Sequence, residues 1–261
     1  MQCLLYRITP MKKPSLFTLF LILSIELSFS QDKIECDRPD QTETPCIVPA
    51  GHFQMESGFY YAHESKDEKG FIYPSTLLKY GIANIAEIRV EIQNSSTLIS
   101  DETGKNLVHG VSPITFGMKL KICEEKKTVP KISVILKTSI PLLASEKLKE
   151  DYPTTQIRFT FQHALSKKFS FSYNLGGLWD GQQQKIFGLY TITSGYSITD
   201  NLSCYLELYG FVAKEQDHRF DGGFCFTLKK NVMLDISAGI SIDRKQPSWF
   251  SGLGISFLLP N

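Results

Sequence analysis

The sequence of 261 residues contains little that would direct it to a helical membrane domain or to a nucleic acid. Beyond residue 30 it has no apolar run of about 18 or more residues, which excludes transmembrane helices there. The net charge is only +1, and no basic cluster with interleaved aromatic residues occurs, so we expect no nucleic-acid partner. The chain also lacks a glycine-rich loop of the kind that binds phosphate groups.

The residue patterns of metal and catalytic sites are missing as well. The five histidines form neither an HxxxH nor an HExxH motif, and the cysteines do not follow a zinc-binding spacing. We therefore predict no metal, no cofactor and no catalytic residue. A lipid-modifying enzyme is the least favoured alternative. It would use His163, which shares one side of its strand with Phe159 and Phe161 but has no suitably placed serine and acid.

The N-terminal region has the three parts of a secretory signal. A charged start at Met11–Lys13 precedes an apolar stretch from Leu16 to Leu27, and Ser28–Ser30 gives a small-x-small cleavage site. We predict a signal peptide over residues 1–30, cleaved near Ser30/Gln31, with Met11 as the true start. The protein is therefore expected to leave the cytoplasm.

From His52 onward, apolar and polar residues alternate in runs of roughly ten residues. In one run Phe116 and Met118 lie on one side of the strand, while Gly117 and Lys119 lie on the other. Alternation with period two predicts β-strands, and about 9–11 residues suffice to cross a bilayer at a tilt. We predict twelve strands, over residues 52–61, 75–83, 85–93, 113–123, 131–140, 155–162, 169–176, 186–197, 202–210, 220–228, 232–242 and 249–259.

The connections between these strands alternate between long and short. The short ones are mostly tight turns of Asn, Asp and Lys, whereas the long ones are charged and varied: residues 62–73, 94–112, 141–154, 178–185, 211–219 and 243–248. This alternation predicts an all-β fold, a transmembrane antiparallel up-and-down β-barrel over residues 52–261. The long loops would be extracellular and both termini periplasmic. Its partners would be outer-membrane lipid and, during biogenesis, the barrel-assembly machinery.

Residues 31–51 form a polar, proline-containing leader that we expect to be extended and periplasmic. It could enter the barrel as a plug, or stay outside as a tether, and the tether is slightly favoured. Cys36 and Cys46 flank part of this leader, and an oxidising periplasm would permit a disulfide between them. The residues of a plug would be Asp37, Arg38, Asp40 and Glu43.

A barrel of twelve strands should have a narrow lumen, partly filled by its own side chains. The cations expected to face it lie on early strands and most of the carboxylates on late ones, so a basic wall could face an acidic wall across the pore. The favoured alternative is that these charges pair across adjacent strands and only rigidify the barrel. The predicted lumen residues are Glu56, Lys79, Glu87, Arg89, Glu91, Lys119, Lys121, Lys137, Arg158, Tyr205, Glu207, Asp221 and Asp235.

Several motifs carry a family resemblance. They are DRPDQTETP at 37–45, VPAGHFQME at 48–56, Tyr73-Pro74 with LLKYGI at 77–82, and EIRV at 87–90. Together they resemble the bacterial outer-membrane proteins grouped as transporters of the phenol meta-degradation pathway. The resemblance covers nearly the whole mature chain and implies a β-barrel that moves small compounds, aromatic ones among them. Lys79 stands where the family pattern has arginine, and the cysteines at 36 and 46 are not part of it, which leaves the substrate open.

The sequence thus predicts an outer-membrane channel for passive passage of small-molecule solutes. The alternative is a structural or adhesive barrel whose loops, especially residues 94–112, bind an extracellular partner.

Overall fold

The computed structural model describes residues 33–101, 104–212, 217–242 and 248–259. The predicted signal peptide, with Met11 and the cleavage site, lies outside these residues. No helix among the described residues is long and apolar enough to cross a membrane. Their elements are the strands β1 (Phe53–His63), β2 (Glu68–Ala83), β3 (Ala86–Asp101), β4 (Gly104–Val111), β5 (Ile114–Cys123), β6 (Lys131–Ile140), β7 (Thr155–Ala164), β8 (Phe169–Asp180), β9 (Lys185–Ser197), β10 (Leu202–Val212), β11 (Asp217–Lys229), β12 (Val232–Ser241) and β13 (Trp249–Leu259), and the 3-10 helices η1 (Pro141–Leu143) and η2 (Glu146–Leu148).

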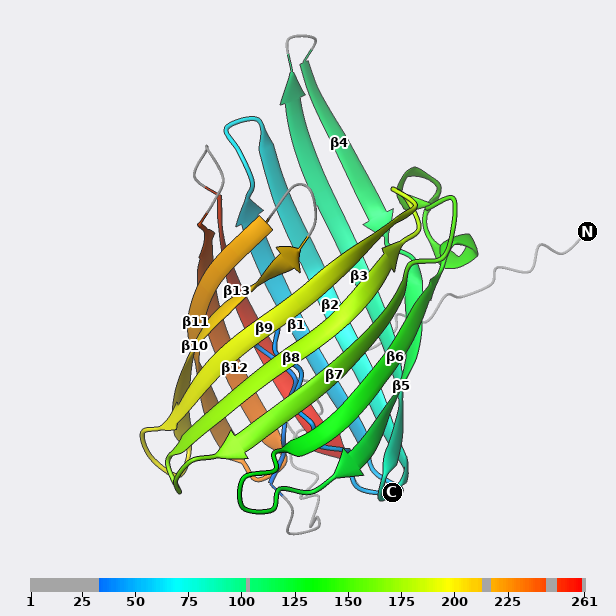
Figure 1. The fold of residues 1–261 in the computed structure, drawn as a ribbon. Coiled ribbons are helices and arrows are strands. Elements are labelled where there is room, and N and C mark those ends of the chain that lie inside the picture. The colour runs from blue at the N-terminus through cyan, green and yellow to red at the C-terminus, as the bar shows by residue number, and fades with distance from the viewer. Residues whose placement is uncertain (1–32, 102–103, 213–216, 243–247, 260–261) are drawn as a thin grey trace, which may run out of the picture. The chain divides into compact units, whose positions relative to one another are not determined.

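Twelve of these strands close into an antiparallel barrel (Figure 1). Each strand of the ring pairs with its neighbour in the chain, and β1 pairs with β13 to complete it, with Phe53 opposite Leu259 and His63 opposite Trp249. Strand β4 pairs with β3 and stands outside the ring, since β3 also pairs with β2 and β5. The predicted fold class and strand number are confirmed.

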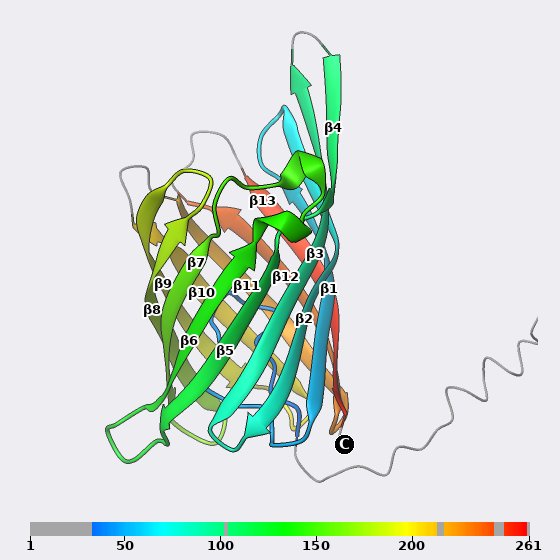
Figure 2. The same cartoon turned by 90° about the vertical axis from the view of Figure 1, so that its right-hand side faces the viewer.

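Two of the predicted long loops are wrong, because they are largely strand. Strand β2 already begins at Glu68, while residues 94–101 form the upper part of β3 and residues 104–111 form β4. Figure 2 shows this β3–β4 hairpin projecting past the end of the barrel. Its residues are mostly polar on both sides, because a hairpin beyond the barrel needs no apolar side toward lipid. The alternation that predicts the other strands is therefore absent from it.

The barrel wall reverses the burial pattern of a water-soluble protein. On β5, Met118 is 41% and Leu120 36% exposed, while Lys119 between them is fully buried. On β8, Leu175 is 53% exposed and its neighbour Asn174 is fully buried. Apolar side chains on the outside and polar side chains on the inside are what a barrel surrounded by hydrocarbon requires.

The leader lies inside the barrel (Figure 1) and not outside it as a tether. The leader has two limbs, one before and one after its turn. The first limb, which carries Ile34, enters beside the β11–β12 turn, where the Ile34 amide donates to the Lys230 carbonyl oxygen at 2.7 Å. Its second limb leaves at the same end, where Ala50 bridges Gly81 of β2. The two limbs carry Ile34 and Val48 into a small apolar cluster with Met233 and Leu258 of the wall. The segment between them, residues 35–47, is thereby held as a loop within the lumen.

Candidate functional site

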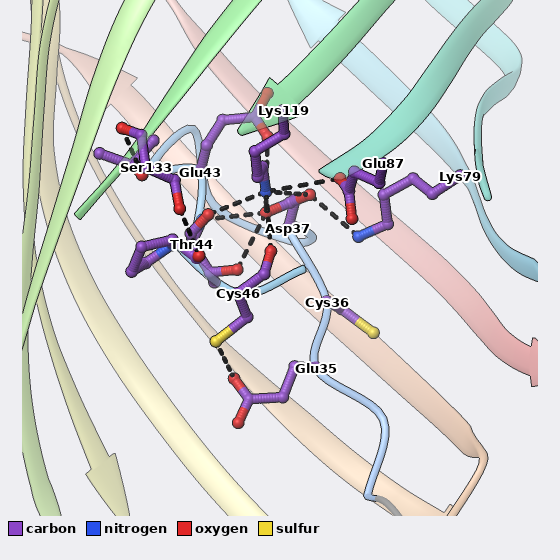
Figure 3. A network of polar contacts seen from close by, with 12 residues as sticks. Glu35, Cys36, Asp37, Glu43, Thr44, Cys46, Lys79, Glu87, Lys119 and Ser133 are labelled. Atoms are coloured by element: carbon purple, nitrogen blue, oxygen red, sulfur yellow. Dashed lines mark hydrogen bonds and ion pairs between the residues drawn. The ribbon is translucent and has the colours of Figure 1, made fainter. Parts of the chain in front are cut away.

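Asp37 of the leader is the centre of the largest group of buried charges (Figure 3). Its carboxylate oxygens lie 3.0 Å from Lys119 Nζ, 2.9 Å from Lys79 Nζ and 3.2 Å from Arg89 Nη2, three cations that β5, β2 and β3 point inward. Burial alone would raise the pKa of Asp37, but Lys119, Lys79 and Arg89 outweigh it and hold that pKa well below its ordinary value. Asp37 is therefore ionised and firmly held.

Side chains of the barrel wall bind the second limb of the leader and make the hydrogen bonds that water would otherwise make to it. Arg89 Nη2 lies 2.7 Å from Glu43 Oε2. Asn174 accepts a hydrogen bond from the Glu43 amide at 2.8 Å and donates one to the Glu43 carbonyl oxygen at 3.0 Å. Ser133 donates to the carbonyl oxygen of Pro45 at 2.6 Å. Because buried peptide groups need partners, such side chains let an extended segment lie within the lumen without forming a strand.

Arg38 points the opposite way, toward the late strands. Its guanidinium lies 2.7 Å from Asp235 Oδ1 and donates through Nε to Oδ2 at 3.2 Å, a two-pronged ion pair. It also lies over the Tyr60 ring, 4.9 Å from the centroid. Gly58 and Gly254 face each other across β1 and β13, and a Cβ at either position would collide with this guanidinium. These two glycines therefore provide the space that Arg38 occupies.

The turn of the leader reaches the wall near the middle of the barrel. The Gln41 amide donates to Glu207 Oε2 at 2.7 Å, and Thr42 Oγ1 donates to Thr191 Oγ1 at 2.6 Å. Arg158 donates to the Gln41 carbonyl oxygen at 2.7 Å. Residues from β7, β9 and β10 thus fix the turn from several sides.

Asp40, beside this turn, has surroundings opposite to those of Asp37. It is half-buried, and burial together with the carboxylates Glu207 and Asp221 holds its pKa well above the ordinary value. No ion pair joins Asp40 to a cation among the residues that the structure describes.

Two of the cavities that adjoin the leader inside the barrel lie on opposite sides of its turn. The outer cavity, about 220 Å³, opens toward the hairpin end and is lined by Glu91, Lys137 and Arg158. The inner cavity, about 290 Å³, lies toward the short turns and is rich in hydroxyl groups from Ser170, Ser172, Thr193, Ser203 and Thr227. Both are bordered by Arg38 and Asp40, so the leader separates the two halves of the lumen.

Most of the residues predicted to face the lumen are buried inside the barrel. Two pairs lie nearer its ends: Lys137 is 2.9 Å from Glu91, and Lys121 is 2.7 Å from Glu124. The buried ones, each at most 9% exposed, are Glu56, Lys79, Glu87, Arg89, Lys119, Arg158, Tyr205, Glu207, Asp221 and Asp235.

The sequence left two arrangements open for these charges, pairing across adjacent strands and a basic wall opposite an acidic wall. Both occur in part. Lys79 contacts Glu56 on the adjacent strand, and Lys119 lies 3.8 Å from Glu87 across β5 and β3. The cations and the late carboxylates do not face each other across open space, however. The leader lies between them, with Asp37 toward the cations and Arg38 toward Asp235.

The disulfide that the sequence left open is not formed, since Cys36 and Cys46 are free thiols. Cys36 packs beside the apolar cluster of the two limbs, whereas the Cys46 sulfur lies 3.0 Å from Glu35 Oε2 and 3.3 Å from Lys131 Nζ. Burial and the Glu35 carboxylate raise the pKa of Cys46 to about 12. The two thiols therefore have different neighbours, and Cys46 is neutral at pH 7.

The sequence did not single out several residues that hold the leader. Ser133 and Asn174 were recognisable only as inward-facing polar residues, and Gly58 and Gly254 only as gaps in the alternation. His163, considered for an enzyme, stacks on Tyr173 with ring centroids 6.4 Å apart. No group of three or more His, Cys, Asp or Glu in the described ranges is arranged to hold a metal ion.

Solved structures show the same fold at low sequence identity. The COG4313 outer membrane channel from Pseudomonas putida F1 aligns with a TM-score of 0.66 and 12% identity, covering 86% of this chain and 100% of that one. The NanC porin gives 0.54 and 9%, covering 78% and 98%, and the KdgM porin gives 0.53 and 9%, covering 77% and 98%.

No curated protein sequence matches this chain. A family model does, over residues 36–259, which include the buried part of the leader and nearly the whole barrel. The chain therefore belongs to the family described as "Putative MetA-pathway of phenol degradation".

Proposed function

We propose that this protein is a passive channel of the outer membrane for small solutes, and that its own leader is the plug of the channel. The observation that carries the proposal is the pair of cavities on opposite sides of the leader, both bordered by Arg38 and Asp40. A solute that crosses the barrel must pass the leader. The channel fold of the solved relatives and the polar lumen support the same function.

The way the leader is held suits a plug that can be displaced. Its two limbs share one small apolar cluster, while the segment between them is held by ion pairs and hydrogen bonds. Water can satisfy those polar groups when the segment leaves the wall, so release costs less than unfolding an apolar core would. Both limbs enter at the same end, which allows the segment to withdraw without threading through the barrel.

The outer cavity suggests which solutes enter first. Its lining carries both charges and neutral groups that form hydrogen bonds: the cations Arg38, Lys137 and Arg158, the carboxyl groups of Asp37, Asp40, Glu43, Glu56 and Glu91, and Thr76, Gln93 and Thr115. Such a mixed lining suits small polar solutes, and the family adds aromatic compounds to the candidates. The lumen offers these solutes hydrogen bonds and charge, and it contains no energy-coupling motif, so passage is driven by the concentration gradient.

Liposome swelling tests this proposal. Liposomes that contain the mature protein are transferred into isosmotic benzoate or glucose, next to empty liposomes and liposomes with a variant lacking residues 36–46. We expect slow swelling with the intact chain and faster swelling with the variant. Equal swelling of all three preparations, with both proteins correctly folded on gels, would refute the channel.

The β3–β4 hairpin favours adhesion as a second candidate function. It projects past the barrel end (Figure 2) and exposes Ile99 by 39% and Leu107 by 49%. Replacing residues 95–110 with a short turn should leave swelling unchanged. If that variant also keeps the full adhesion of cells that carry the protein, the adhesive function is rejected.

A further inference from the structure

Three carboxylates meet where the leader touches β10 and β11. Glu207 and Asp221 are direct partners in the register of these two strands, and each is only 1% exposed. Asp40 of the leader is close enough to interact electrostatically with both. Like charges directly opposite on neighbouring strands destabilise a sheet, so this arrangement needs a shared proton or a compensating positive charge.

None of the nearby arginines forms an ion pair with these three carboxylates. Arg38 pairs with Asp235 and Arg219 pairs with Glu64, while Arg158 donates to the carbonyl oxygen of Gln41 and forms no ion pair among the described residues. Glu207 accepts hydrogen bonds from the Gln41 amide and from Thr hydroxyls, which are neutral donors. The carboxyl groups of Asp40 and Asp221 thus form no ion pair with a cation in the described part of the chain.

Buried polar atoms lie beside these carboxylates. By hydrogen-bond geometry, both carboxylate oxygens of Asp221 and the hydroxyl of Tyr205, a residue only 7% exposed, lack a well-aligned partner among the described residues, although Glu207 and Tyr205 are near enough to Asp221 to share a proton with it. The Tyr205 hydroxyl interacts electrostatically with Asp221, Asp40 and Glu207, so it lies in the same part of the lumen. Leaving a buried polar group unsatisfied is costly, so these atoms indicate a ligand that donates hydrogen bonds and carries positive charge.

The inner cavity gives such a ligand a way in. Asp40 and Tyr205 both line this cavity of about 290 Å³, together with the hydroxyls of Thr42, Thr193 and Ser203. The carboxylates are not arranged to hold a metal ion within the described ranges. An ammonium group suits the site better, because it has three hydrogen-bond donors and needs no fixed coordination shell.

We propose that Asp40, Glu207, Asp221 and Tyr205 form a binding site for the primary ammonium group of a small organic cation that enters through the inner cavity. The inference rests on the proposed function, since it names one class of solute that the lumen would admit. The ammonium group donates hydrogen bonds to Asp221, Asp40 and the Tyr205 oxygen, and the rest of the molecule lies among the hydroxyls of the cavity.

Saturation-transfer NMR on the full mature protein in detergent micelles tests the site. The probes are propylammonium, propanol and propanoate, which have similar size but positive, zero and negative charge. We expect saturation transfer to propylammonium at pH 7 and little to the other two. Asp221→Asn and Asp40→Asn should each weaken propylammonium binding by about tenfold or more, the usual effect of losing a charge-assisted hydrogen bond. Glu124→Gln, at an exposed turn, should leave it unchanged.

Asp40→Asn keeps the test informative if Asp221→Asn fails to fold, because Asp40 lies in the leader and not in a strand. Equal signals for the three probes, or unchanged propylammonium binding in both variants, would overturn the proposal. Absence of any signal at pH 7 would also overturn it and would indicate that a shared proton neutralises the carboxylates. Binding in micelles does not require conduction, so a protein that binds propylammonium but never conducts would refute only the channel.

Discussion

The two sides of the lumen hold the same leader in different ways. On the basic side, formed by Lys79, Arg89 and Lys119, the Asp37 carboxylate has three cationic partners. On the acidic side, formed by Glu207, Asp221 and Asp235, only Arg38 brings positive charge from the leader, and Asp235 is the one carboxylate of the three with which it forms an ion pair. The basic side therefore fixes the leader, whereas the acidic side is left with carboxyl groups that an incoming cation can pair with.

This difference matters because the charges are buried. Removing one member of a buried ion pair leaves the other uncompensated, at a cost of about 3–5 kcal/mol. Pairs near the barrel ends are partly exposed to solvent and cost far less to break. The following variants use this contrast, and the free energy of releasing the leader can be measured by hydrogen exchange of the amides in residues 36–46.

The largest effect is expected from Lys119→Met on the basic side. Lys119 is fully buried, contacts Asp37 at 3.0 Å and donates to the Thr44 carbonyl oxygen at 2.8 Å. Its loss should lower the free energy of leader release by about 3–5 kcal/mol. Lys121→Met is the matched control on the same strand, because Lys121 pairs with the exposed Glu124 and should change release by about 1 kcal/mol at most. Equal effects of the two substitutions on leader release would contradict the claim that burial makes the Lys119 contacts the stronger ones.

Arg38→Met should have the next largest effect, because the acidic side has only this one ion pair with the leader. Loss of the contacts to Asp235 should cost about 1.5–3 kcal/mol of release free energy, also measured by hydrogen exchange. Arg38→Lys should be intermediate, since lysine keeps the charge but lacks the planar fork. A lysine variant that behaves like the native chain would show that the two-pronged geometry is unimportant.

The pH dependence of leader release should follow Asp40. A carboxyl group whose pKa is raised in the docked state stabilises that state at low pH, and this contribution disappears as the pH rises through the raised pKa. Release should therefore become easier as the pH rises from about 4, the ordinary pKa of a free aspartate, toward the raised pKa of the docked state, by at most about 1.4 kcal/mol per pH unit. Asp37 has a lowered pKa, so its contribution stays constant above about pH 4.

Asp40→Asn should flatten this pH profile, and saturating propylammonium should flatten it in the native chain as well. A profile of the same slope in Asp40→Asn, or docking that strengthens as the pH rises, would assign the effect to another group.

Lys137→Met should have the smallest effect on docking. Lys137 pairs with Glu91 at 2.9 Å where both side chains are partly exposed, so its loss should change leader release by less than about 1 kcal/mol. Since it lines the outer cavity, its loss should still shift the reversal potential in a KCl gradient toward cation selectivity. An unchanged reversal potential together with weakened docking would contradict this prediction. It would show that Lys137 holds the leader and does not set ion selectivity.

The barrel wall was largely predictable from the sequence because lipid and water impose opposite demands on alternate residues. Met118 and Lys119 follow this rule, and so do Asn174 and Leu175. The rule does not apply beyond the barrel end, where both sides of a strand meet water. The β3–β4 hairpin therefore resembled a loop, although its residues 95–101 and 104–110 pair in regular register.

The position of the leader was less predictable, because a polar extended segment suits both the periplasm and a polar lumen. The sequence showed Asp37 and Arg38 as adjacent opposite charges, and it showed the walls that would receive them. It could not show that Gly58 and Gly254 lie opposite each other, because this depends on the pairing of the first and last strands. Nor could it reveal the partners of the leader amides, such as Glu207 and Asn174, which come from distant strands.

Single-channel conductance in planar lipid bilayers tests most directly whether the leader closes the lumen. Recordings of the intact mature chain are compared with those of a chain lacking residues 36–46, after heat-modifiable gel migration has shown that both barrels are folded. If the leader is the plug, the intact chain conducts little and only in brief openings, while the shortened chain conducts continuously and at a higher level. Equal conductance of the two chains would contradict this account.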